Sequence, residues 1–417
     1  MSSTKTSNTF DKSICVLISL VLLSSFLPIQ YIGGYAIISA MSDALLINPA
    51  LAESNLFITF SIGLTLGEFL LGPLADKYGR LPIAIICLNI YSVSSLICAI
   101  HYSQYWFLFF RMISGFAVAS GIIITRIIIS DHLSLEHGAS MLSRVKMYAN
   151  ILTAMFPLLI NYAITSFDLG WLSFFIFNAI LCCGVSIQSF YLLNKLKQPI
   201  LNPHALRLKT MKHGFKETIG KDHYRRPLFA FLLIATLINL FSFSAPIITN
   251  ILHGDIKMML LAIGAGTAIS AFVILYINKT LLNRGMGITK IIYILQATLT
   301  IVVLGLFCFL RLPLSNIELY NGFLLFFLCA SGLLIALISN LFMICSQSLD
   351  KEKVNAGFIT SLTISLKGFT SFAASMILPM LRGADLYSII LLITGFTCAV
   401  SLYYQVSYKK IAGGSNN

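Results

Sequence analysis

The chain has 417 residues, of which 58% are hydrophobic and only 10% are charged, and its formal net charge is +13. A mean hydropathy of +0.89 and repeated long apolar runs exclude a soluble globular domain and are typical of a protein with many membrane spans. The basic excess lies in loops, which argues against a nucleic-acid-binding surface.

Twelve apolar stretches are long enough to cross a bilayer, which takes about 20 helical residues. They predict an all-α membrane protein with twelve transmembrane helices at 14–42, 53–75, 81–101, 104–130, 140–165, 170–194, 227–252, 257–278, 286–310, 318–346, 354–381 and 385–408. The first run follows Lys5 and Lys12 and is too long for the apolar core of a signal peptide, so we expect it to stay as an uncleaved span.

One long polar stretch, 195–226, separates the first six spans from the last six and holds nine of the 28 Lys and Arg. The sequence therefore predicts two six-helix bundles, 1–194 and 227–417, joined by a basic linker. By this topology 23 of the 28 bases lie on the side of the N-terminus, and only three lie on the opposite side. This asymmetry predicts that both termini and the linker are cytoplasmic.

The nonapeptide Gly72-Pro73-Leu74-Ala75-Asp76-Lys77-Tyr78-Gly79-Arg80 follows the second span directly. It predicts a tight, charged turn at the membrane surface. Gly72 lacks a side chain where a neighbouring helix could approach, and Gly79 permits a sharp reversal of the backbone. Asp76 and Arg80 can pair with each other or with the ends of neighbouring helices. The spacing Gly63-x-x-x-Gly67 in the same span indicates a second face for close helix packing.

This nonapeptide resembles the signature loop between helices 2 and 3 of the major facilitator superfamily, G-x-L-x-D-[RK]-x-G-R. Its six key positions are filled, by Gly72, Leu74, Asp76, Lys77, Gly79 and Arg80; Leu81 stands where the family usually has another base. The resemblance implies two bundles with a substrate site between them. Asn283-Arg284-Gly285, between spans 8 and 9, is a degenerate second copy of the loop.

Further motifs resemble the bicyclomycin-resistance-like branch of drug:proton antiporters. Arg111 to Gly115 matches R-x-x-x-G in helix 4, and Arg126 and Asp131 recur at the cytoplasmic end of that helix. Pro157 and Asn161 in helix 5 approximate the branch's P-l-l-G, with Asn where Gly is usual. Members of the branch often have an acid in helix 1, two residues before a Tyr that corresponds to Tyr35. Gly33 stands at that position, and the whole of 14–42 lacks a carboxylate.

Three ionisable residues lie well inside predicted spans, namely Glu68, Arg111 and Lys367, and intramembrane charges are costly and usually functional. Counting about 1.5 Å per residue, Glu68 lies about 10 Å and Lys367 about 18 Å from the cytoplasmic ends of their helices. Their side chains lean toward each other, so the two are predicted to pair. Such a pair could be structural, or it could take the place of the missing helix 1 acid in proton coupling. For Arg111, hydrogen bonding to backbone carbonyls of a neighbouring helix is the alternative to a coupling role.

Polar and aromatic residues of helices 1, 4, 5, 7 and 10 are candidates for lining a central substrate cavity, although each could be ordinary packing. They are Tyr31, Tyr35, Ser114, Asn150, Asn239, Phe243 and Asn340. The nine cysteines lie within apolar runs without a C-x-x-C pair, and the seven histidines lie at span ends or in loops. We therefore expect no metal, no cofactor and no enzymatic site.

The resemblance implies a secondary transporter of the bacterial inner membrane that exports a small amphipathic compound by alternating access, coupled to protons. In this interpretation it is a monomer whose partners are a small-molecule substrate, protons and membrane lipid, without nucleic acid. Two alternatives stay open: an importer or a metabolite or siderophore permease of the same fold, and a transporter-like receptor without flux. The predicted gating motif consists of Gly72, Asp76, Lys77, Gly79, Arg80 and Asp131.

Overall fold

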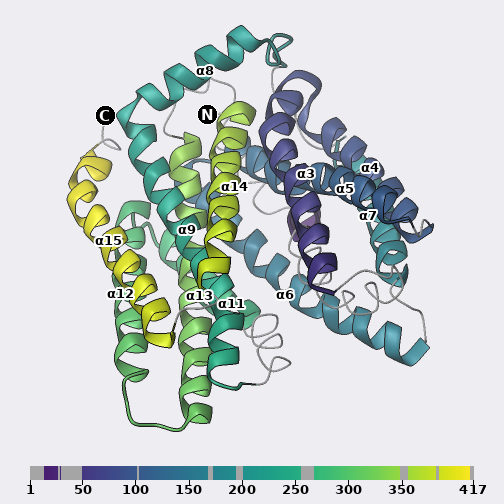
Figure 1. Cartoon of the computed structure of the whole chain (residues 1–417). Coiled ribbons are helices and arrows are strands. Elements are labelled where there is room, and N and C mark those ends of the chain that lie inside the picture. Colours follow the sequence, from purple (N-terminus) through teal and green to yellow (C-terminus); the bar gives the residue numbers. More distant parts are fainter. Residues whose placement is uncertain are drawn as a thin grey trace. The chain divides into compact units, whose positions relative to one another are not determined.

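The computed structural model describes residues 14–26, 29, 49–100, 103–167, 172–193, 201–254, 267–347, 356–381 and 385–413 (Figure 1). The first described helix is the apolar segment Ile14–Phe26. The later helices are α3 (Pro49–Tyr78), α4 (Arg80–Ile100), α5 (Gln104–His132), α6 (Leu135–Phe167), α7 (Leu172–Leu193), α8 (Leu208–Gly220), α9 (Asp222–Ile251), α11 (Thr267–Asn283), α12 (Ile288–Phe309), α13 (Asn316–Gln347), α14 (Ala356–Leu381) and α15 (Leu386–Gly413). Apart from α8, each of these helices corresponds to one of the twelve predicted spans, and no strand occurs in the described ranges.

Seven of the described helices are long and apolar enough to cross a membrane over the lengths Arg80–Ile100, Gln104–His132, Leu172–Tyr191, Asp222–Phe241, Ile288–Phe309, Asn316–Gln347 and Leu386–Tyr404. Many of their large apolar side chains, such as Ile100, Ile301 and Leu402, are exposed on the outside of the protein. An apolar surface of this kind is compatible with lipid and would be a liability in water. The all-α membrane fold predicted from the sequence is confirmed.

Contacts divide the chain into two compact units. The first unit holds residues 1–133, 148–215 and 351–365, and within it α3 packs on α5, and α4 packs on α5 and α7. The second holds residues 134–147, 216–350 and 366–417, and within it α13 packs on α9, α11 and α12, while α15 packs on α9 and α12.

The first turns of two helices belong to the compact unit of the opposite sequence half. The start of α14, in the second half, belongs to the first unit through residues 351–365, and the start of α6, in the first half, belongs to the second unit through residues 134–147. The compact units therefore differ from the predicted domains 1–194 and 227–417, whose boundary at 195–226 stays a prediction.

Glycines bring α3 and α5 into close contact. A Cβ added to Gly63 would lie 1.8 Å from the carbonyl oxygen of Met112, and one added to Gly115 would lie 2.1 Å from that of Phe60. A Cβ on Gly67 would lie 2.4 Å from the carbonyl oxygen of Phe116. Backbone oxygens cannot move aside as a flexible side chain can, so this contact depends on small residues. The packing face predicted from Gly63-x-x-x-Gly67 is the face that meets α5.

The structure corrects two element boundaries. α3 continues to Tyr78 and α4 begins at Arg80, so the predicted nine-residue turn is reduced to Gly79. This glycine has a φ of 102°, and its N–H bonds the carbonyl of Ala75 at 3.0 Å, which is a common way to end a helix. In the linker, α8 is a helix that the sequence analysis did not predict.

Candidate functional site

The backbones of α3 and α14 meet at Gly72. A Cβ on Gly72 would lie 2.1 Å from the carbonyl oxygen of Gly357 and 2.1 Å from the Oγ of Ser361. The N–H of Gly72 donates a hydrogen bond of 2.8 Å to the same Oγ. We call the contact of Gly72 and Asp76 with Gly357, Phe358 and Ser361 the α3–α14 seam. It joins the second predicted span to the eleventh without a bulky side chain in between.

Asp76, one turn after Gly72 on α3, binds the N-terminus of α14. Its Oδ1 accepts the N–H of Gly357 at 3.1 Å, and its Oδ2 accepts the N–H of Phe358 at 2.9 Å. These two amides lie in the first turn of α14, where backbone donors have no partner within the helix and where the helix dipole favours a negative charge. Asp76 is 2% exposed, so water does not replace it as the acceptor. The carboxylate therefore caps a helix of the opposite sequence half.

Arg80 connects this cap to α5. One guanidinium nitrogen donates to Asp76, and its Nε donates to the Oδ2 of Asp131 at 3.3 Å. Asp131 lies in the last turn of α5, where the helix dipole disfavours an acid, and Arg80 compensates that charge. The predicted gating residues Asp76, Arg80 and Asp131 are thus brought together, whereas Lys77 lies beside them with its ammonium 4.7 Å from the ring centre of Tyr78.

The linker also contacts the seam. The N–H of Asn202 donates to the main-chain carbonyl of Asp76 at 3.0 Å. Gly214 of α8 lies against the ring of Phe358, which a Cβ there would approach to 3.1 Å. Two parts of the linker therefore hold the two sides of the α3–α14 seam, one on each helix.

The buried carboxylate of Glu68 interacts electrostatically with Arg126 of α5. The two side chains are 4% and 5% exposed and lie on the two helices that the glycine contact brings together. Sequence reasoning noted Arg126 but did not pair it with Glu68. Lys367, the predicted partner, is half-buried in the part of α14 that belongs to the second unit. The pairing of Glu68 with Lys367 stays a prediction.

Arg111 lies among aromatic rings. Its guanidinium carbon is 4.4 Å from the ring centre of Phe60 on α3 and 5.8 Å from that of Phe175 on α7, and the residue is 1% exposed. A cation over an aromatic face is attracted by the ring quadrupole, by about 2 kcal/mol where water is excluded. The rings of Phe60 and Phe175 therefore stabilise a charge deep in the first unit.

The structure describes the side chains of only some of the predicted cavity residues. Ser114 is buried and shares a hydrogen bond of 3.0 Å with Ser94 of α4, and Asn340 is fully buried in contact with Asn278. Asn150 and Asn239 are half-buried, and the amide nitrogen of Asn150 has no hydrogen-bond partner among the described residues. Pro157, Asn161 and Phe243 belong to α6 and α9, but their side chains, like Tyr31 and Tyr35, lie outside the described residues. A substrate-binding role stays a prediction for all of them.

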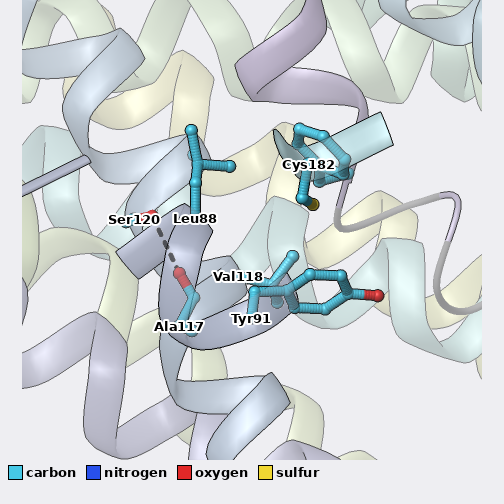
Figure 2. A pocket seen from close by; sticks show the side chains of 8 residues that line it. Leu88, Tyr91, Ala117, Val118, Ser120 and Cys182 are labelled. Carbon is cyan, nitrogen blue, oxygen red and sulfur yellow. Dashed lines mark hydrogen bonds between the residues drawn. The ribbon is translucent and has the colours of Figure 1, made fainter. Parts of the chain in front are cut away.

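One small cavity lies inside the first unit, between α4, α5 and α7 (Figure 2). Its lining is mostly apolar, and the one hydrogen bond drawn there, from Ser120 to the carbonyl of Ala117, stays within α5. It is lined by Phe26, Leu88, Tyr91, Ala117, Val118, Ser120, Gly121 and Cys182. This cavity is too small for a drug-sized ligand, for which pockets measure about 300 Å³ or more.

These features define a multi-span helical protein with a buried polar contact between helices of its two sequence halves. Among the described residues, no group of His, Cys, Asp or Glu could hold a metal ion. A comparison with protein families matches residues 14–375 to the model of the Major Facilitator Superfamily. The chain belongs to this superfamily, and it is therefore a membrane transporter and not an enzyme.

Curated relatives with partial similarity include several called multidrug resistance protein MdtL. The protein of Klebsiella pneumoniae subsp. pneumoniae is 29% identical over 157 residues, 37% of this chain and 39% of the relative. The protein of Vibrio parahaemolyticus is 25% identical over 315 residues, 75% of this chain and 76% of the relative. With the first of these relatives, the chain thus shares about two fifths of the relative's length.

Solved structures of the same fold align with nearly the whole chain. The human organic anion transporter MFSD10 (TETRAN) is 14% identical with a TM-score of 0.69, covering 96% of this chain and 99% of its own. The transporter FucP in the outward conformation is 12% identical with a TM-score of 0.68, covering 94% and 98%. At such identities the likeness shows the fold alone.

Proposed function

We propose that the protein is a multidrug-type exporter that moves small amphipathic compounds out of the bacterial cell by alternating access, driven by protons. The names of the MdtL relatives support the substrate class, most extensively over the 315 residues shared with the Vibrio protein. The family supports alternating access between two bundles, with the substrate site near the middle of the membrane.

The observation that carries this proposal is the α3–α14 seam. Three hydrogen bonds make the contact between these helices of the two halves: two N–H groups of α14 donate to the carboxylate of Asp76, and the N–H of Gly72 donates to the hydroxyl of Ser361. Such a contact can open and close without repacking large side chains, because glycines stand at its centre. In the proposed cycle, the charge cluster of Asp76, Arg80 and Asp131 stabilises the outward-facing state, in which the cytoplasmic side is closed.

Proton coupling is proposed for Glu68, with Arg111 and Lys367 as further candidates. Helix 1 lacks the acid that is common in the branch it resembles, and Glu68 is a buried carboxylate in the span that bears the gating motif. Glu68 and Arg126 lie together in the buried contact of α3 and α5, so a movement between these two helices would change the surroundings of the carboxylate.

We also propose that the protein is a monomer in the inner membrane with both termini and the linker 195–226 in the cytoplasm. The uneven distribution of Lys and Arg supports this orientation. A reporter that is active only in the cytoplasm, fused after Asn417, should be active; activity of a periplasmic reporter at that position would contradict both the orientation and the even number of spans.

Transport in proteoliposomes tests the proposed function. We expect a lipophilic drug to move against its gradient when a pH gradient is imposed, and to stop when the gradient is dissipated with a protonophore. Empty liposomes are the control for drug partitioning. Drug flux that ignores the pH gradient would rule out proton coupling, and an absence of flux across a panel of amphipathic compounds would rule out multidrug export.

In the same vesicles, Glu68→Gln should abolish flux driven by the pH gradient while downhill exchange of drug continues, because the carboxyl that binds the proton is lost. A structural role of the pair predicts instead that Glu68→Gln lowers the yield of folded protein, and that adding Arg126→Met restores it, since replacing both members of a buried ion pair is often tolerated. Flux in this double variant that still follows the pH gradient would exclude Glu68 as the proton carrier.

A further inference from the structure

A second polar contact joins the sequence halves, between the start of α6 and the helices α11 and α13 of the second unit. The Nδ2 of Asn278 on α11 donates to the Oγ of Ser143 on α6 at 2.8 Å. Asn278 and Asn340 of α13 exchange amide hydrogen bonds of 3.1 and 2.8 Å. All three residues are fully buried, with relative exposures of 0%. We call this group the amide latch.

A second layer lies nearer the helix ends. The Oγ of Ser140, one turn before Ser143 on α6, donates to the Oδ1 of Asn283 at 2.7 Å. Asn283 is the last residue of α11. Both layers consist of neutral amides and hydroxyls, whereas the α3–α14 seam has the carboxylate of Asp76 at the corresponding end, bound by the guanidinium of Arg80.

The amide latch follows the same pattern as the α3–α14 seam. Gly285, after α11, has a φ of 80°, as Gly79 after α3 has a φ of 102°. Asn278 precedes Gly285 by the seven residues that separate Gly72 from Gly79. At each of these positions α3 or α11 donates a hydrogen bond of 2.8 Å to a serine near the start of α14 or α6. The shared spacing supports an internal repeat that relates the two contacts, with a main-chain N–H as the donor in one and a side-chain amide in the other.

The chain order places both contacts on one side of the membrane. Six spans separate the end of α3 from the end of α11, and an even number of crossings returns the chain to the side on which it began. α6 and α14 also start on that side, since two spans separate α6 from the end of α3 and two separate α14 from the end of α11. The exchanged segments 134–147 and 351–365 are the starts of these two helices.

We propose that Asn278 and Ser143 form a second, uncharged latch that closes the cytoplasmic side together with the α3–α14 seam and opens in each transport cycle. Asn340 is a positioning residue, which holds the amide of Asn278 toward Ser143. This inference rests on the proposed alternating access, because a latch needs a cycle in which to open.

Some hydrogen bonds of the latch lie within the second half and others join the two halves, and this arrangement fits the proposed role. Asn278 and Asn340 both belong to the second half, so their paired bonds persist when α6 departs. Opening then breaks the single hydrogen bond to Ser143 and the outer bond from Ser140 to Asn283. A buried amide without a partner would be costly, and the pairing with Asn340 limits that cost. Asn278 thus stays oriented for the next closure.

Hydrogen–deuterium exchange of the full-length protein in detergent tests the latch without any substrate. Ser143→Ala should raise exchange in residues 135–147 about fivefold, which corresponds to the loss of one neutral hydrogen bond of about 1 kcal/mol. Ser339→Ala is the matched control. Ser339 is a buried serine beside Asn340, and its Oγ donates a hydrogen bond to the carbonyl of Ile335 in its own helix.

The positioning role of Asn340 is tested by combining variants. If Asn340 acts through Asn278, then Asn340→Ala should also raise exchange in residues 135–147, and Ser143→Ala should add little in that background. Independent structural roles predict that the two effects add. The proposal is overturned if Ser143→Ala leaves residues 135–147 unchanged, or if Ser339→Ala has the same effect, or if exchange rises evenly over all helices. Because these readouts need no drug, a failure of multidrug flux is distinguishable from a failure of the latch.

Discussion

Gly72→Ala is expected to reduce drug flux by about a hundredfold while the protein still inserts into the membrane. The added Cβ would lie 2.1 Å from a backbone oxygen of α14, and backbone atoms cannot rotate away as a side chain can. The α3–α14 seam then cannot close, and a transporter that cannot close one side does not complete its cycle. Flux in proteoliposomes, with the amount of inserted protein measured in the same vesicles, gives this result directly.

Gly184→Ala is the matched control, because Gly184 lies in helix α7 of the same unit and a Cβ there would meet nothing within 4 Å. Alanine is the better helix former by about 1 kcal/mol, so this control should insert and transport at least as well as the unmodified protein. Equal flux in the two variants would show that the close approach at Gly72 has no part in transport.

Asp76→Asn is expected to shift the protein toward the state with an open cytoplasmic side and to lower flux at least tenfold. The variant loses the negative charge that holds Arg80 and caps α14, and hydrogen bonds to charged groups contribute about 1.5–3 kcal/mol each. A shift of about 2 kcal/mol changes an equilibrium about thirtyfold. Hydrogen–deuterium exchange in residues 356–365 should rise accordingly, because the amide NH2 group of Asn cannot accept a hydrogen bond and one of the two amides, of Gly357 or Phe358, loses its acceptor.

Asp222→Asn is the control for the removal of an acid, because Asp222 lies in the linker that we propose to be on the same, cytoplasmic side of the membrane as Asp76. Asp222 pairs with Arg225 and Arg226, but its side chain is 51% exposed, and exposed pairs contribute about 0–1 kcal/mol. Its flux and exchange should match those of the unmodified protein. If Asp76→Asn behaves like Asp222→Asn in both measurements, the charge cluster does not control the gate.

Sequence reasoning located the α3–α14 seam from one side only. Gly72, Gly79 and Asp76 are recognisable because close approach, a left-handed turn and a buried acid each demand a particular residue type. Their partners on α14 are mostly main-chain groups, at Gly357 and Phe358, and the sequence carries no distinct signal for a carbonyl or an N–H. The fold could be predicted because twelve apolar runs and a basic linker leave few alternatives.

The surroundings of Glu68 could be predicted from the sequence only in part, and its pairing with Lys367 stays a prediction. Rise per residue places Glu68 and Lys367 at compatible depths, yet helix packing decides which neighbour a side chain meets. Gly67 brings α3 against α5, and this contact places Glu68 near Arg126. The amide latch could have been predicted from one sequence signal. The seven-residue spacing from Asn278 to Gly285 repeats the spacing from Gly72 to Gly79.

The cap on α14 has a consequence for biogenesis. The acceptor of the first amides of α14 is a side chain that the ribosome has made 281 residues earlier. Asp76 therefore leaves the ribosome and enters the membrane surface long before its partner on α14 exists, and water and Arg80 are the partners available to it while eight further spans are inserted. The first turn of α14 acquires its acceptor only when this late helix docks on the nascent first half. Capping of the eleventh helix by Asp76 thus requires that this helix has docked on α3.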